Sequence, residues 1–136
     1  MDVSIDTDWR STMMANAARD PYYRASVRRE TLANPLYEEF IQDKCSTCHV
    51  PMAHFTTAAA GGKTVMLDDG VFASTHPDHT LAMDGVSCTL CHQIQSEGLG
   101  TAESYSGGLL FDETKPTGER AVFGQFAVAE SWVMVM

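Results

Sequence analysis

All four cysteines of this 136-residue chain fall in two copies of one pattern, CSTCH at residues 45–49 and CTLCH at residues 88–92. Two thiols at this spacing can add to the two vinyl groups along one porphyrin edge, and the adjacent histidine can then coordinate the iron, which is why C-x-x-C-H is typical of c-type haem attachment. The sequence therefore predicts two covalently held haems c and their iron. The predicted attachment residues are Cys45, Cys48, Cys88 and Cys91, and the predicted proximal iron ligands are His49 and His92.

Two other kinds of site can be built from paired cysteines. One C-x-x-C pair could be a thioredoxin-like redox pair, and four cysteines could form an all-thiolate zinc site. No βαβ pattern surrounds either pair, and zinc ribbons usually place their paired cysteines closer together. Neither alternative explains a histidine directly after both pairs, so the pattern favours haem.

The charge of the chain limits its partners. Its formal net charge is −9, from 18 acidic residues against 9 lysines and arginines. Such a chain is a poor ligand for phosphate backbones, and a basic redox protein suits it better than nucleic acid. No apolar run is long enough to predict a transmembrane segment. The first residues, MDVSID, lack the basic start of a signal peptide, and the last, SWVMVM, carry no polar tail, so we expect a segment of a longer protein whose export signal is absent here or removed.

The local patterns predict helices before the first motif and loops after it. We expect helices over 8–19 with a cap at Asp8, over 22–32 after Asp20-Pro21, and over 36–44 after Asn34-Pro35, with Pro51 stopping the helix that carries the motif. Residues 56–62 and 98–118 predict loops, and residues 65–72 predict a short hairpin with an Asp-Gly turn. The expected fold is mainly α with long loops and little β, one or two short hairpins, in a single dihaem segment over 1–136. Its helical first third is 8–49, its loop-rich remainder is 50–136, and haem organises its core.

Four phrases around these motifs are similar to one family. They are WRSTMMANAARDP at 9–21, KCSTCHVPMA at 44–53, DGVSCTLCHQI at 84–94 and AVFGQF at 121–126. Together they span nearly the whole chain, and they resemble the multihaem cytochromes c that bacteria export. The resemblance implies electron transfer in a periplasmic or extracellular respiratory chain, through further haem sites beyond this segment. The resemblance does not identify the electron donor or the electron acceptor.

The distal iron ligands are less constrained than the proximal ones. His76 and His79 lie in a loop before the second motif that could fold over a haem, and we favour His79. His54 lies too close to the first motif to reach the far face of that haem, so it would serve a neighbouring haem or lie on the surface. In related cytochromes the phrase around Met14 often carries a histidine at this position, which suggests Met14 as a thioether ligand. Helical methionines are also common core residues, so packing of Met13 and Met14 stays an open alternative. Met134 and Met136 could act similarly near the end of the chain.

Aromatic and basic residues are expected to support the haems. The aromatic residues would pack on porphyrin faces or in an ordinary core; they are Trp9, Tyr22, Tyr23, Tyr37, Phe40 and Phe55. Arginines are concentrated in the first third, where some could pair with haem propionates. Arg28 and Arg29 better fit a solvated helix face.

Three classes of function remain open. The first and favoured class is an electron-transfer module with two six-coordinate haems and no catalytic residue. The second is a haem enzyme with one open axial site that reduces or oxidises a small nitrogen or sulfur compound. The third is a subunit of a multihaem filament, whose haems continue into neighbouring subunits.

Overall fold

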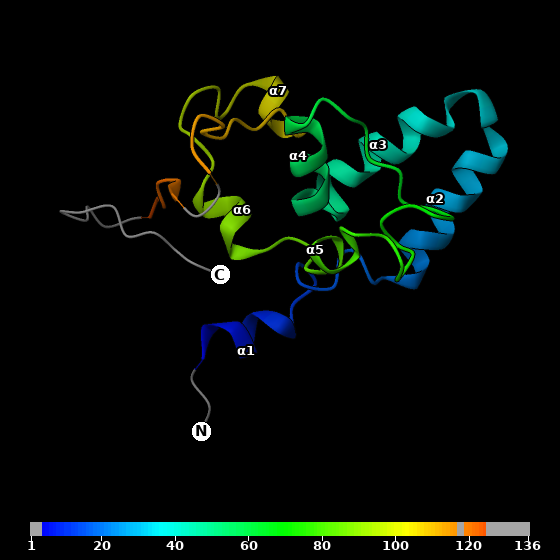
Figure 1. Cartoon of the computed structure of the whole chain (residues 1–136), viewed down its shortest axis with the longest axis horizontal. Helices are drawn as coiled ribbons and strands as arrows, with labels where there is room; N and C mark the ends of the chain where they lie inside the picture. The colour runs from blue at the N-terminus through cyan, green and yellow to red at the C-terminus, as the bar shows by residue number, and fades with distance from the viewer. Residues whose placement is uncertain (1–3, 117–118, 125–136) are drawn as a thin grey trace. The chain divides into compact units, whose positions relative to one another are not determined.

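A computed structural model of the chain describes residues 4–116 and 119–124, and in these residues it is mainly helical with no β-strand. The elements of the described residues follow one another in this order (Figure 1): α1 Ile5–Arg10, α2 Pro21–Ala33, the 3-10 turn η1 Pro35–Tyr37, α3 Glu38–His49, α4 Pro51–Ala59, α5 His79–Met83, α6 Cys88–His92 and α7 Ala102–Tyr105. The chain divides into two compact units, residues 1–87 and 88–136, so each unit carries one C-x-x-C-H motif. The predicted mainly α class is confirmed.

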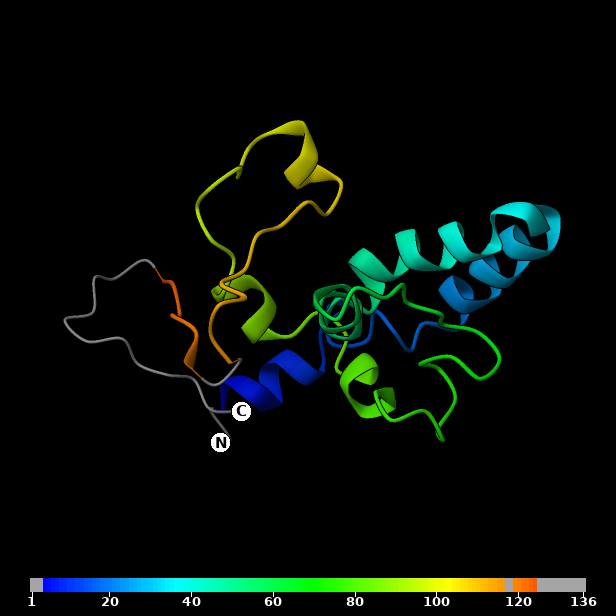
Figure 2. The ribbon, with the colours of Figure 1, turned by 45° about the horizontal axis from the view of Figure 1, so that its top comes forward.

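Helix α2 forms where the sequence predicts it. The Asp20 side chain caps the helix by accepting a hydrogen bond from the Tyr22 amide at 2.9 Å, and Pro21 takes the first helical position, where its missing N–H costs nothing. The buried residues Tyr23, Val27 and Thr31 recur every four positions, so they form one face of the helix. In both views α2 and α3 lie side by side (Figures 1 and 2), and they are in direct contact.

The helix predicted over 8–19 is wrong. Helix α1 is capped by Ser4 rather than Asp8 and ends at Arg10, and residues 11–19 form successive turns. Polar side chains take up the backbone groups that a helix would use: the Asn16 amide donates to the carbonyls of Arg10 (3.0 Å) and Thr12 (2.8 Å). Such side-chain bonds offer the backbone an alternative to a helix.

Around the first motif the structure is more helical than predicted. A 3-10 turn over 35–37 precedes α3, which continues past Lys44 through the motif to His49. As predicted, no helix runs through Pro51, but Pro51 starts α4 rather than a loop. The loop predictions are therefore wrong for residues 56–59, and also for residues 102–105, which form α7. Proline is well tolerated at the first helical position, and the alanines that follow are strong helix formers.

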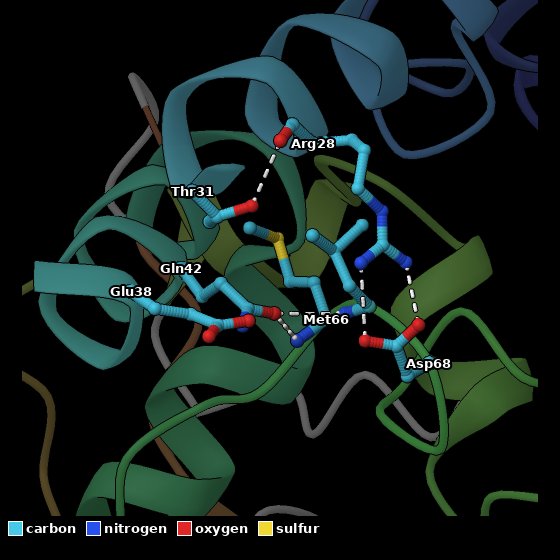
Figure 3. Close-up of polar contacts among 7 residues, drawn as sticks. Arg28, Thr31, Glu38, Gln42, Met66 and Asp68 are labelled. Carbon is cyan, nitrogen blue, oxygen red and sulfur yellow. Dashed lines mark hydrogen bonds and ion pairs between the residues drawn. The ribbon is translucent and has the colours of Figure 1, made fainter. Parts of the chain in front are cut away.

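The predicted hairpin over 65–72 is a hydrogen-bonded turn without strands. The amides of Val71 and Phe72 donate to the carbonyls of Val65 (2.9 Å) and Met66 (3.0 Å), which closes the turn. The amides of Met66 and Leu67 donate instead to one atom, the Gln42 side-chain oxygen on α3, at 2.9 and 2.8 Å (Figure 3). Because a side chain takes these donors, no strand ladder forms.

The same turn is also held to α2. The Arg28 guanidinium forms two hydrogen bonds with the carboxylate of Asp68, at 2.6 and 3.1 Å (Figure 3). Asp68 has φ +55°, a left-handed conformation in which aspartate is one of the few tolerated residues. Arg28 is therefore more than part of a solvated helix face, because it holds the turn against α2.

The core of the first unit consists mostly of small and medium-sized side chains. Its buried members are Ala18, Tyr23, Val27, Val50, Ala53, Met66, Leu67, Val71, Ala82 and Met83, with Cys45 and Phe72 packed against them. Met66 and Val50 are the largest side chains that are fully buried. This core joins α2, α4, α5 and the 65–72 turn to α3, the helix that carries the first motif.

Candidate functional site

The first motif occupies the last turns of α3. Cys45 and Cys48 lie three positions apart on this helix, a spacing that places side chains on one helix face. Both thiols are free; Cys45 is half-buried against the core, whereas Cys48 is exposed. Burial raises the pKa of the Cys45 thiol, and the nearby Cys48 and Glu30 raise it further. Both side chains are available for a covalent bond to a ligand that lies across this face.

His49, the next residue, lies against an aromatic ring. Its imidazole stacks on Tyr23 with ring centroids 3.6 Å apart and planes at 6°. The His49 Nδ1 atom is buried and has no hydrogen-bond partner in the described part of the chain. An unpartnered buried nitrogen costs about 1–3 kcal/mol, and such groups in native proteins often have a functional role. The Tyr23 hydroxyl is itself satisfied, since it donates to the Met66 sulfur at 3.3 Å.

The second motif forms the whole of the short helix α6. Cys88 and Cys91 are free thiols, and Cys91 is exposed. His92 pairs twice with one residue: its Nδ1 lies 2.6 Å from the Phe123 carbonyl oxygen, and its own carbonyl accepts from the Phe123 amide at 2.7 Å. A carbonyl can only accept, so Nδ1 must carry the proton. In the neutral ring the lone pair then lies on Nε2, which is how histidine ligands in metal sites are commonly held.

The same reasoning separates His79 from His76. His79 Nδ1 lies 3.0 Å from the Val71 carbonyl oxygen, so Nδ1 donates and Nε2 holds the lone pair. His76 Nδ1 instead accepts from the Asp78 amide at 3.1 Å, so the neutral His76 ring carries its proton on Nε2. Of these two histidines, only His79 has its ring lone pair free of a hydrogen bond among the described residues, and its role as an iron ligand stays a prediction.

His54 is tied into the first unit rather than lying on the surface. The Ser46 hydroxyl donates to the Asp43 carbonyl at 2.6 Å, so His54 Nδ1 must donate to Ser46 Oγ at 2.8 Å. His54 Nε2 lies 3.4 Å from the Thr47 hydroxyl. Burial lowers the pKa of His54, although the Asp43 carboxylate opposes this, and the lowered pKa favours the neutral ring.

Met13 and Met14 are not core residues. Their side chains are 86% and 52% exposed. The Met14 backbone is nevertheless fixed, because its carbonyl accepts from the Val86 amide at 3.0 Å. Exposure removes core packing as the explanation for this methionine pair, and the role of Met14 as an iron ligand stays a prediction. Met134 and Met136 lie outside the described residues.

The aromatic residues divide into two groups. Tyr23 is buried, Trp9 donates to the Val86 carbonyl at 3.1 Å, and Phe55 lies edge-on to His54 with ring centroids 5.0 Å apart. Three others are exposed and contribute to no ordinary core; they are Tyr22, Tyr37 and Phe40.

The donor set suits covalently bound haem. Each motif has two free thiols followed by a histidine, and at the second motif the imidazole is held in the tautomer that an iron ligand needs. In the residues that the structure describes, no three histidine, cysteine or acidic side chains come together as a metal-binding group. No described helix combines the length and apolar character needed to cross a membrane.

Sequence reasoning missed two partners of these histidines. Phe123 and Val71 contribute backbone carbonyls, which leave no mark on residue type. The only available signal was the phrase AVFGQF at 121–126, which resembles the exported cytochromes and contains Phe123. Searches with the chain found no matching family model, no matching characterised protein and no matching solved structure.

Proposed function

We propose that this chain is a dihaem segment of an exported multihaem cytochrome c and that it transfers electrons between redox proteins or neighbouring haem subunits. Cys45 and Cys48 would bind one haem and Cys88 and Cys91 the other, with His49 and His92 as proximal ligands. The observation that carries the proposal is the second motif, where Phe123 holds the His92 ring with Nε2 free for iron beside two free thiols. The bound iron would supply one-electron redox chemistry.

The residues of the chain have defined tasks in this proposal. The Phe123 carbonyl keeps the proton on His92 Nδ1, orients the ring and makes Nε2 a better donor. The Val71 carbonyl does the same for His79, the proposed distal ligand among the loop histidines. Met14 is the proposed thioether ligand, and an imidazole on one iron and a thioether on another would separate the two reduction potentials.

Intact-mass measurement after acid–organic extraction tests the central claim. The protein, produced with an export signal and haem-maturation machinery, should carry the mass of two haems. A Cys88→Ser/Cys91→Ser double variant should carry one haem, and Cys45→Ser/Cys48→Ser should do the same. A wild-type mass equal to the bare polypeptide, or to the polypeptide plus zinc, contradicts the proposal.

A spectrum of the reduced protein with and without carbon monoxide separates the two main functional classes. Two six-coordinate haems should leave the spectrum nearly unchanged, as expected for an electron carrier. Rapid binding of carbon monoxide to one haem would favour an enzyme with an open axial site. His79→Ala should create such an open site, whereas His76→Ala serves as the matched control and should not.

The periplasmic or extracellular location follows from the same chemistry. Haem attachment to these motifs needs a compartment with the haem-maturation machinery, and the resemblance points to exported proteins. Cell fractionation of the native organism should recover the haem-staining protein outside the cytoplasm. A haem-loaded protein confined to the cytoplasm would contradict this location.

A further inference from the structure

A hollow of about 700 Å³ in the first unit is lined by an unusual share of positive charge. Its lining includes Arg10, Arg19 and Arg24 together with His79, Met83 and Asp84. Only 9 lysines and arginines occur in this acidic chain. Three of them therefore line one hollow, beside the start of α5.

The Arg24 side chain is held rigidly at this hollow. Its Nε donates to the Ala18 carbonyl at 2.9 Å, and its guanidinium carbon lies 4.2 Å from the centroid of the Phe72 ring. One terminal nitrogen donates to the Met83 sulfur at 3.1 Å, and a thioether is a weak acceptor that carries no charge. The guanidinium is thus oriented by the fold without being neutralised.

Arg19 adds a second positive charge beside the first. Both side chains line the same hollow. Burial lowers the pKa of Arg24, and the charge of Arg19 lowers it further. Arg19 itself is exposed. Two like charges that line one hollow disfavour each other's charged form, and a bound anion would remove this penalty.

No carboxylate of the described residues forms an ion pair with Arg19 or Arg24. Ion pairs among the described residues join Arg10 to Asp6, Arg28 to Asp68, Lys63 to Glu39 and Lys115 to Asp112. In that part of the chain Arg19 and Arg24 form none, although acidic residues outnumber lysines and arginines 18 to 9. Asp84 lines the same hollow without pairing with either arginine.

We propose that Arg19 and Arg24 bind a carboxylate or a tetrahedral oxoanion in this hollow. Guanidinium groups present planar pairs of N–H donors that match carboxylate and phosphate oxygens. Two sources share this chemistry: a free oxoanion from solution, or the propionate of a haem bound to this chain. The second source rests on the proposed function, whereas the first is independent of it.

Isothermal titration of the purified protein with inorganic phosphate at low ionic strength tests the free-anion source. Wild-type protein should bind phosphate at one site, and Arg19→Gln should weaken binding about tenfold or more, the loss expected for one charge-assisted contact. Arg29→Gln is the matched control, because Arg29 is exposed on α2 and does not line the hollow. Arg24→Lys keeps the charge but removes the planar pair of donors, and should also weaken binding.

Redox titration of the haem-loaded protein across pH tests the propionate source. If a haem propionate fills the hollow, the wild-type protein will not bind phosphate. In that case Arg19→Gln will change the pH dependence of one haem reduction potential, and Arg29→Gln will leave it unchanged. The proposal is overturned if the wild type binds no phosphate and Arg19→Gln leaves the potentials unchanged, or if Arg19→Gln and Arg29→Gln weaken phosphate binding equally. A protein found to lack haem refutes the proposed function, and phosphate binding alone then decides this site.

Discussion

The Gln42 side chain offers the sharpest test of how the first unit is held together. It is 3% exposed, and its single oxygen accepts from two buried amides, those of Met66 and Leu67 (Figure 3). Gln42→Ala would remove the acceptor that both amides share. The change should therefore loosen the 65–72 turn. Val71 of this turn supplies the carbonyl that orients His79.

The expected effect follows from the cost of unsatisfied buried donors. Each amide left without an acceptor costs about 1–3 kcal/mol. Because the shortened side chain lets water approach at least one of the two amides, we expect a loss of about 2–4 kcal/mol for the pair. Each 1.4 kcal/mol changes an equilibrium constant tenfold, so the equilibrium constant between the closed and the open turn should fall by about 30- to 1000-fold.

Amide hydrogen exchange measures this equilibrium directly. Protection of the Met66 and Leu67 amides should fall by that factor in Gln42→Ala. Glu38→Gln is the control: Gln42 donates its Nε2 to Glu38 at 3.3 Å, so this change disturbs the same side chain without removing its oxygen. Protection within threefold of wild type in Gln42→Ala would refute the assignment of Gln42 as the acceptor that closes the turn.

Three further predictions concern other residues. Met14→His should lower one haem potential and abolish a sulfur-to-iron band in the near infrared; no change in either would show that Met14 is not a ligand. Gly85→Ala should lower the free energy of unfolding, measured with denaturant, by at least about 1 kcal/mol more than Gly61→Ala does. Both glycines have positive φ, but of the two only Gly85 would bring a Cβ against backbone, 2.5 Å from the Met14 carbonyl oxygen. Equal losses of stability in the two variants would refute this close approach. The hydrogen bonds from Arg28 lower the pKa of Asp68 in the folded protein. The pair should therefore stabilise the fold at pH values above the ordinary aspartate pKa of about 4, and this contribution should be lost as pH falls through the lower folded-state pKa. If Asp68→Asn unfolds in acid with the same pH dependence as wild type, this prediction is wrong.

Several local features could be predicted from the sequence because neighbours in the chain determine them. The Asp20-Pro21 pair specifies the start of α2 within the chain itself, through a cap on the Tyr22 amide and a proline at the first helical position. The two C-x-x-C-H strings likewise place their thiols and histidine by spacing alone. The same local reasoning failed at residues 11–19, where the Asn16 side chain bonds to the backbone and the turns replace a helix.

The hairpin expectation at 65–72 failed for a different reason. Its Asp-Gly turn does close, but the acceptor for two of its amides is Gln42, 24 and 25 positions earlier in the chain. Local turn chemistry cannot indicate such an acceptor. The Gln42 side chain on α3 therefore determines that this segment forms a turn bound to the helix and not a pair of strands.

By itself the sequence determined the two C-x-x-C-H strings on which the proposed haem attachment rests, since that pattern depends only on residue type and close spacing. Only the tertiary structure decided which histidines keep a free lone pair, because His79 and His92 are held by carbonyls 8 and 31 positions away. It alone also brought Arg24 to the Met83 sulfur, 59 positions apart, and placed Arg19 in the same hollow, with no ion pair to either arginine among the described residues. Tautomer and charge pairing depend on which atoms meet in space, and residues distant in the chain meet only after the core has formed.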